Sequence, residues 1–135
     1  MASQTNQTSS TEQAMHLLDT WMHQINTHDV DAICKLYNAQ GILHPTLSAR
    51  LLTTPEGIRG YFAQFLSLKN LKGNLIGDAE ICHSGTDQEL LLAAGFYSFQ
   101  YEEKGDLTSL MARFTFAWNS EGTILHHHSS ATPQP

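Results

Sequence analysis

The chain has few basic residues, few charged residues of either sign and only two cysteines. Seven Lys and Arg stand against thirteen Asp and Glu among 135 residues, which gives a formal net charge of -6. Nucleic-acid binders need a basic stripe, so this balance excludes that class. No apolar run approaches the roughly 20 residues of a membrane helix, and the N-terminus lacks the basic and apolar regions of a signal peptide. We therefore expect a cytoplasmic protein that contacts neither nucleic acid nor a membrane.

Length and composition predict a single domain. A chain of 15.0 kDa has room for one hydrophobic core, and a hydrophobic share of 41% excludes a fully disordered chain. Cys34 and Cys82 show no disulfide or metal spacing and fit reduced thiols. Polar composition predicts a disordered arm over residues 1–9 and a frayed end over Thr132–Pro135, so we expect one domain over residues 10–133.

The first half of the chain has the apolar spacing and capping signals of three helices. Ser10 is the expected N-cap of the first, whose apolar stripe ends at Ile25. Asp29 is expected to cap a short second helix, and Thr54–Glu56 starts the third with a hydroxyl cap followed by proline. Between the last two helices, Gly41–Pro45 is predicted as a short strand that proline ends.

The second half has the period of strands. Two short extended pieces are expected between Leu75 and Cys82, followed by a turn at Ser84–Asp87. Leu90–Tyr101 and the alternating Leu110–Trp118 are predicted as long strands, and Ile124–His128 as a last one. Helices in one half and a strand meander in the other indicate an α+β domain, with the helices on one face of a largely antiparallel sheet.

Four motifs give the chain a family resemblance: Asn26–Asp29, Thr54–Arg59, Ala112–Phe116 and Ile124–Pro133. With this element order, the chain resembles the nuclear transport factor 2-like superfamily. Its ending is most similar to bacterial relatives of the calcium/calmodulin-dependent protein kinase II association domain. The resemblance implies a curved, mixed or antiparallel sheet wrapped by three helices into a cone, with a pocket at the wide end. It also implies homodimers or higher homo-oligomers that pack through the sheet. The superfamily contains ketosteroid isomerase, polyketide cyclases, dehydratases and non-catalytic assembly modules, so the fold does not fix an activity.

His44 and Trp21 are the residues on which isomerase-type chemistry would depend. By the resemblance, His44 lies about where ketosteroid isomerase has its carboxylate base. It is a candidate general base, or else a histidine of the pocket wall that only forms hydrogen bonds. Trp21 stands near the position of the isomerase's tyrosine, and Ala112 near that of its second acid. An indole lacks the acidity of a phenol, so Trp21 is expected to pack in the core or to stack on an apolar ligand.

Arg113 is the only cation in the apolar Leu110–Trp118 segment. A buried guanidinium needs an anion, because an unpaired charge there is very unfavourable. Glu80 and Glu89 are the nearest acids by sequence. Arg113 resembles a pocket arginine of the association domain, and we leave two partners open. One is a carboxylate of a small ligand, and the other is a salt bridge within the protein or at a dimer interface.

Other ring side chains complete the predicted ligand set. On a strand, His126 and His128 point to one side and His127 to the other. His126 and His128 could share a metal with His44 or His83, but no further metal motif accompanies them, so we expect no metal and no cofactor. Tyr61 and Tyr97 are expected to orient a ligand with their phenols or to cap the rim of the core.

Two functions from different classes follow. The first is a small-molecule-binding domain, with isomerase, cyclase or dehydratase chemistry as an open question, in which His44 is the base and Arg113 the anchor. The second is a non-catalytic oligomerisation module. The first requires an open cavity between the sheet and its helices, with His44 and Arg113 converging on it. It fails if Trp21 and the phenylalanines fill that space while the guanidinium lies outside in water.

Overall fold

The computed structural model describes residues 9–84 and 90–133. Its helices are α2 (Ser10–Asn26), α3 (Val30–Lys35) and α4 (Pro55–Phe65). The side chain of Ser9 accepts a hydrogen bond from the Glu12 N–H and caps α2, so the expectation of Ser10 was wrong by one residue. Asp29 and Thr54 cap α3 and α4 as expected.

Five strands form one mixed sheet: β1 (Tyr37–His44), β2 (Lys69–His83), β3 (Leu90–Glu103), β4 (Asp106–Asn119) and β5 (Ile124–Ala131). Their order across the sheet is β1-β5-β4-β3-β2. β1 runs parallel to β5, and the other neighbours are antiparallel. The α+β prediction is therefore confirmed, with the helices in the N-terminal half and an open sheet consistent with the cone fold of the nuclear transport factor 2-like superfamily.

β2 is one long strand where the sequence predicts two short pieces. The pairing of β2 with β3 shifts register between Ile76 and Glu80, and Gly77 in this interval has a φ of 66°. A glycine in the left-handed region is typical of a β-bulge, which bends a strand without ending it. Gly77 therefore bends one continuous strand and does not separate two strands. Of the predicted turn at Ser84–Asp87, only Ser84 lies among the described residues.

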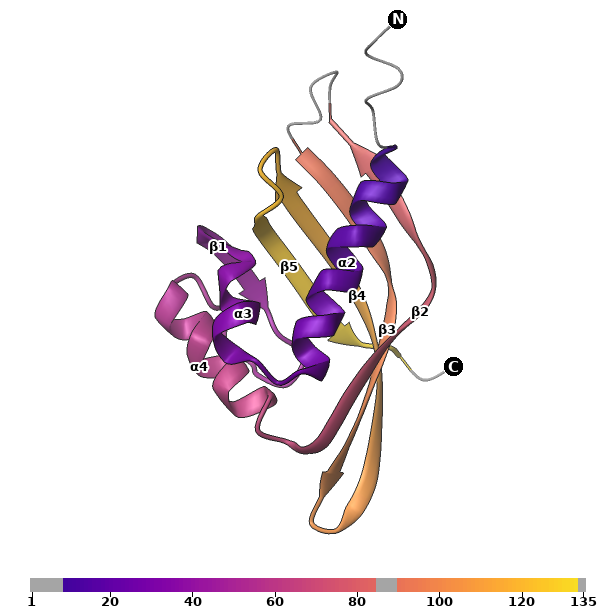
Figure 1. Cartoon of the computed structure of the whole chain (residues 1–135). Helices are drawn as coiled ribbons and strands as arrows, with labels where there is room; N and C mark the ends of the chain where they lie inside the picture. Colours follow the sequence, from indigo (N-terminus) through magenta and orange to yellow (C-terminus); the bar gives the residue numbers. More distant parts are fainter. Residues whose placement is uncertain (1–8, 85–89, 134–135) are drawn as a thin grey trace, which may run out of the picture.

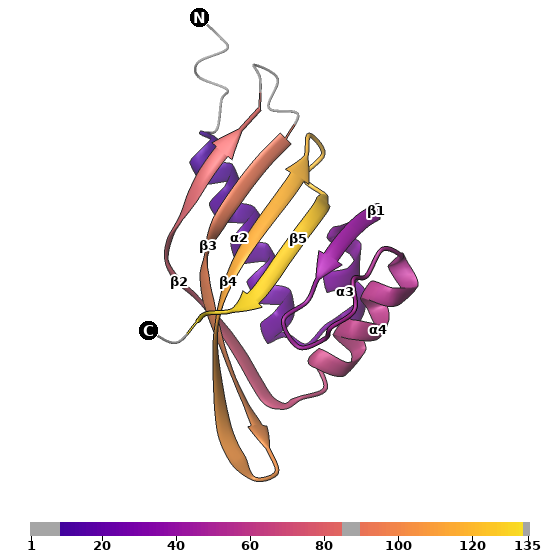
Figure 2. The same ribbon diagram turned by 180° about the vertical axis from the view of Figure 1, so that it is seen from behind.

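The helices cover one face of the sheet only. Figure 1 shows α2 crossing in front of the strands β2–β5, and Figure 2, from behind, shows no helix in front of these strands. The core lies between the two layers and includes Trp21, Phe62, Phe99, Phe116 and Trp118. We call the uncovered side the open face. No helix among the described residues is both long and apolar enough to cross a membrane. Residues 1–8 and 134–135, which carry all but Ser9 of the predicted arm and half of the predicted frayed end, lie outside the described part of the chain.

Candidate functional site: a buried polar chain and an open sheet face

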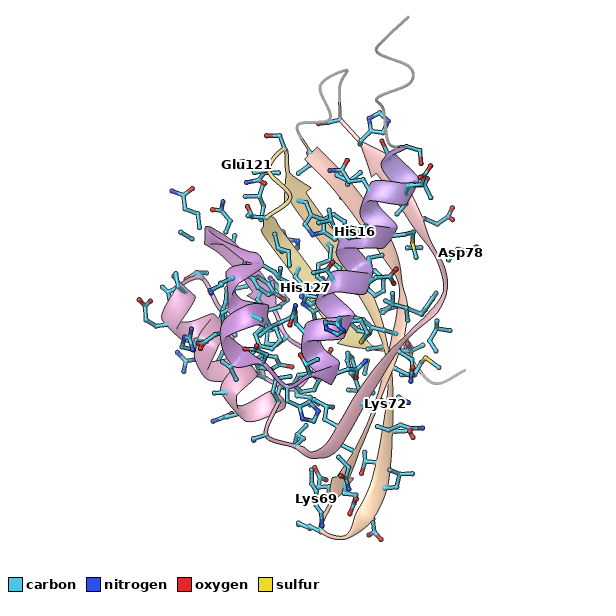
Figure 3. The ribbon with its side chains drawn as sticks, viewed as in Figure 1. His16, Lys69, Lys72, Asp78, Glu121 and His127 are labelled. Carbon is cyan, nitrogen blue, oxygen red and sulfur yellow. The ribbon has the colours of Figure 1, made fainter. Side chains whose placement is uncertain are left out.

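His127 is the polar centre of the core. Along β5 it pairs with Phe116 of β4 and Leu43 of β1, so it points to the covered side. It is buried, its ring stacks on Phe116 with centroids 3.9 Å apart, and it lies near the middle of the molecule in Figure 3. Buried polar side chains need hydrogen-bond partners, and His127 has one at each ring nitrogen.

The partners are two tyrosines from different strands. Tyr37 Oη lies 2.8 Å from His127 Nδ1, and Tyr97 Oη lies 3.0 Å from His127 Nε2. Trp21 Nε1–H donates to Tyr37 Oη over 3.1 Å, and Tyr97 donates to Ser129 Oγ over 2.5 Å. Ser129 Oγ in turn meets Thr46 Oγ1. We call these six side chains the polar chain.

The directions of these bonds assign the tautomer of His127. Because the Tyr97 hydroxyl gives its proton to Ser129, His127 Nε2 must carry a hydrogen to donate to Tyr97. Nδ1 is then the acceptor and takes the proton of Tyr37, whose oxygen already accepts from Trp21. Every donor from Trp21 to Ser129 is satisfied in this single direction. A second proton on His127 would leave the Tyr37 hydroxyl hydrogen without its acceptor.

Burial agrees with this neutral assignment. It lowers the pKa of His127 well below the ordinary value of 6.5, and His126 and His128 lower it further by repulsion. Burial likewise raises the pKa of Tyr37 well above 10.0, and it raises the pKa of Tyr97. The polar chain is thus uncharged and internally satisfied near neutral pH.

Little space remains beside the polar chain. The cavity lined by Trp21, Tyr97 and His127 has a volume of about 20 Å³, enough for about one water molecule. Trp21 stacks on Tyr97 with centroids 5.5 Å apart beside this cavity. The roomy interior expected from the sequence is therefore occupied by side chains, because the aromatic residues of α2, α4 and the sheet meet at its centre.

A larger groove lies outside this core, between α4 and the segment that follows β1. It has a volume of about 520 Å³ and is lined by Leu47, Arg50, Gly60, Tyr61 and Phe65 among others. Tyr61 lies on both the groove and the small interior cavity. Burial raises the pKa of Tyr61 to about 12, and the nearby backbone of Leu47 opposes that shift. Of the predicted ligand residues, Tyr61 lines this groove.

The other predicted site residues lie on the open face. His44, His126 and His128 form a cluster, with ring centroids 5.8 Å apart for His44–His126 and 5.0 Å for His44–His128. Burial lowers the pKa of His126, and repulsion from His44 and His128 lowers it further. None of the three is among the residues that line the small interior cavity, and the role of His44 as a base stays a prediction. No three His, Cys, Asp or Glu side chains of the described residues are arranged to hold a metal ion.

Arg113 corrects one expectation directly. It is exposed on the open face, paired across the strands with Phe96 and Ser130, whereas the apolar surroundings in sequence suggested burial. The reason is strand alternation, which turns Ala112 and Phe114 inward and Arg113 outward. Its Nε–H donates to Ser130 Oγ over 3.1 Å. Arg113 and His44 therefore share a sheet face, but that face is not the wall of the interior cavity.

Sequence reasoning named neither Tyr37 nor Ser129 as a site residue and treated His127 only as the histidine facing away from its neighbours. The available signal was the alternation of β5, which turns His127 and Ser129 to the side opposite His126 and His128. Tyr37 carried no comparable signal, because it reaches His127 across 90 residues of sequence. The ligand-contact roles of Trp21, Tyr61, Tyr97, Arg113, His126 and His128 stay predictions.

Comparison with known proteins gives one family. A family model, the calcium/calmodulin dependent protein kinase II association domain, matches residues 10–133. Among solved structures, a protein from Xanthomonas campestris described as such an association domain superposes with a TM-score of 0.80. It is 30% identical, and the match covers 92% of this chain and 89% of that one. No curated protein matches the chain.

Proposed function

Because the chain belongs to the calcium/calmodulin dependent protein kinase II association domain family, we propose that it is an assembly module that binds copies of itself through the open face. Of the two functions considered from the sequence, we thus favour the non-catalytic oligomerisation module. The family description supports association as the activity, and the distribution of exposed side chains supports the open face as its location.

The observation that carries the proposal is a set of large apolar side chains on the open face. Cross-strand pairing puts Ile76 opposite Phe96, and Phe96 opposite Arg113, all on the side away from the helices. Four side chains there are between a third and a half exposed: Ile42 37%, Ile76 40%, Phe96 48% and Met111 47%. Ile76, Phe96 and Met111 lie on the adjacent strands β2, β3 and β4, and neighbouring exposed apolar side chains on a sheet are unfavourable in water and typical of protein interfaces.

The interior of the covered side offers no comparable binding surface. Its cavity of about 20 Å³ cannot hold a ligand larger than water, and the polar groups around it already bind one another. A ligand that entered would have to replace bonds that are already made. These facts weigh against binding in the core and leave the open face as the better supported surface.

The test is the mass of the protein in solution, measured by sedimentation equilibrium over a range of concentrations. We expect the native chain to form a dimer or a larger assembly. Phe96→Glu places a charge in the apolar surface and should reduce the assembly to monomers. Leu51→Glu is the matched control, because Leu51 is 53% exposed in the segment between β1 and α4, outside the open face. A native chain that is monomeric throughout, or equal effects of the two variants, would refute the proposal.

The groove beside α4 favours a second candidate, the binding of a small apolar carboxylate. Arg50 supplies one cation and Leu47 and Phe65 an apolar wall, while Glu56 places one carboxylate in the same lining. A Cβ added at Gly60 would meet no atom within 4 Å, so Gly60→Leu should fill the groove without disturbing α4. Calorimetric titration with medium-chain fatty acids should then show binding to the native chain and to the exposed control Ala63→Leu, but not to Gly60→Leu. Absence of binding to the native chain removes this candidate.

A further inference from the structure

We propose that two copies pair on the open face through reciprocal contacts between Arg113 of one copy and Glu80 of the other. The two-fold axis would lie in the plane between the two sheets and pass over β3 at Gly95. This inference rests on the proposed self-association and adds its register, the residues that fix it and the position of the symmetry axis.

Arg113 and Glu80 line the same hollow on the open face. The hollow has a volume of about 480 Å³, and its lining also includes Gly95, Phe96 and His128. Arg113 stands opposite Phe96, and Glu80 stands opposite Ala94 on the other side of β3. The two charged residues are therefore separated by two inter-strand spacings and offset by two residues. From standard sheet dimensions their Cα atoms are about 12 Å apart, too far for an ion pair within one copy.

Neither charge is compensated within the described residues. The ion pairs found there are Arg59–Asp31 and Lys69–Glu102, and neither involves Arg113 or Glu80. Arg113 uses Nε–H on Ser130, which leaves its terminal N–H groups for another acceptor. Glu80 is the only acid among the described lining residues of the hollow. Covering the hollow with a second copy would bury both charges, and buried charges without partners are strongly unfavourable.

Two-fold symmetry supplies each charge with the other. In a symmetric interface, if one residue contacts a second, then the second contacts the first on the opposite side. When two sheets pack face to face, the two-fold axis lies in the plane between them. A residue on one side of the axis in one copy then faces the residue of the other copy that lies at the same distance on the opposite side in its own sheet. The midpoint between Arg113 and Glu80 falls on β3 between Ala94 and Phe96, which is Gly95. One axis over Gly95 can thus form both ion pairs at once.

The local surface at Gly95 permits this approach. A Cβ added there would lie 3.0 Å from the Phe114 ring and 3.3 Å from Ala79. These contacts show that the missing side chain would point into the core. The open face at Gly95 is accordingly bare backbone, the floor of the hollow, and two such floors can come close without a side-chain clash.

A charge exchange tests the register. The dimer dissociation constant is measured by sedimentation for Arg113→Glu, for Glu80→Arg and for the double variant, together with the native chain. Each single change places two pairs of like charges in contact and should weaken the dimer by roughly tenfold or more. The double variant restores opposite charges in the reverse order and should return to within about threefold of the native value. Lys35→Glu and Glu121→Arg are the controls, because they change net charge equally at exposed positions outside the hollow.

The outcomes separate this inference from the proposed function. Weakened dimers of both single variants, together with a near-native dissociation constant of the double variant, support the reciprocal pairing. A double variant whose dimer is at least as weak as those of the single variants refutes the pairing but leaves association through the open face intact. Single variants that match the two controls also refute it. A native chain that never dimerises, or a Phe96→Glu variant that assembles normally, overturns the proposed function and this inference together.

Discussion

Removing one hydroxyl from the polar chain should destabilise the fold out of proportion to its size. Tyr37→Phe deletes the oxygen that accepts from Trp21 Nε1–H and donates to His127 Nδ1. Both groups are buried, and both would lose their partner. A buried polar group left unpaired costs about 1 to 3 kcal/mol. Because phenylalanine keeps the ring packing, we expect the free energy of unfolding to fall by about 2 to 4 kcal/mol.

The assay is urea unfolding followed by tryptophan fluorescence, at one fixed protein concentration because association shifts the apparent stability. Tyr101→Phe is the matched control. It makes the same chemical change, but the Tyr101 hydroxyl belongs to no hydrogen bond found among the described residues and is not a buried unpaired atom. We expect it to change the free energy of unfolding by no more than about 0.5 kcal/mol. If Tyr37→Phe costs no more than Tyr101→Phe, the account of the polar chain is wrong.

Three further predictions concern pH and capping. The pKa of His127 is lowered in the folded state, so below about pH 6.5 the unfolded chain binds a proton at this residue and the folded chain does not. The free energy of unfolding should therefore fall by about 1.4 kcal/mol per pH unit between about pH 6.5 and the folded-state pKa. A His127→Gln variant whose stability falls as steeply with pH as that of the native chain contradicts this. His126 also has a lowered pKa, and burying it against a second copy should lower it further, so sedimentation should show dimers at pH 7 that dissociate as the pH falls to 5. A native dimer that is unchanged at pH 5 would contradict that linkage. Thr54→Ala removes the oxygen that accepts from the Gly57 N–H at the start of α4 and should lower the free energy of unfolding by about 1 kcal/mol in urea, whereas Thr53→Ala should change it little.

The elements of the fold could be predicted because their signals are local. The Asp29 and Thr54 caps, the proline that opens α4 and the alternation of Leu110–Trp118 each act within a few residues. The length of β2 could not be predicted, because Gly77 bends that strand through a bulge that depends on its partner β3. The Ser9 cap was missed by one residue, since Ser9 and Ser10 carry the same hydroxyl.

The site was harder to predict because it depends on contacts between distant segments. The sequence places His126, His127 and His128 on alternate sides of a strand, but it does not say which side is covered by helices. That choice decides whether Arg113 is a pocket anchor or a surface charge. It is settled by the helices, which pack on the side of Phe114 and Phe116. The size of the cavity depends likewise on how Trp21 and the aromatic residues of α4 meet, which no spacing in the sequence reports.

The alternation of β5 gives one strand two separate tasks. His127 and Ser129 face inward and hold the polar chain, which joins β1, β3 and α2 to β5. His126, His128 and Ser130 face outward, where Ser130 positions Arg113 beside the hollow. A core held together by directed hydrogen bonds keeps the sheet in one curvature, and two curved faces can pack in register only if each keeps its shape. A filled interior therefore fits the proposed use of this sheet as an assembly surface, whereas a ligand-binding cone would need the same space left empty.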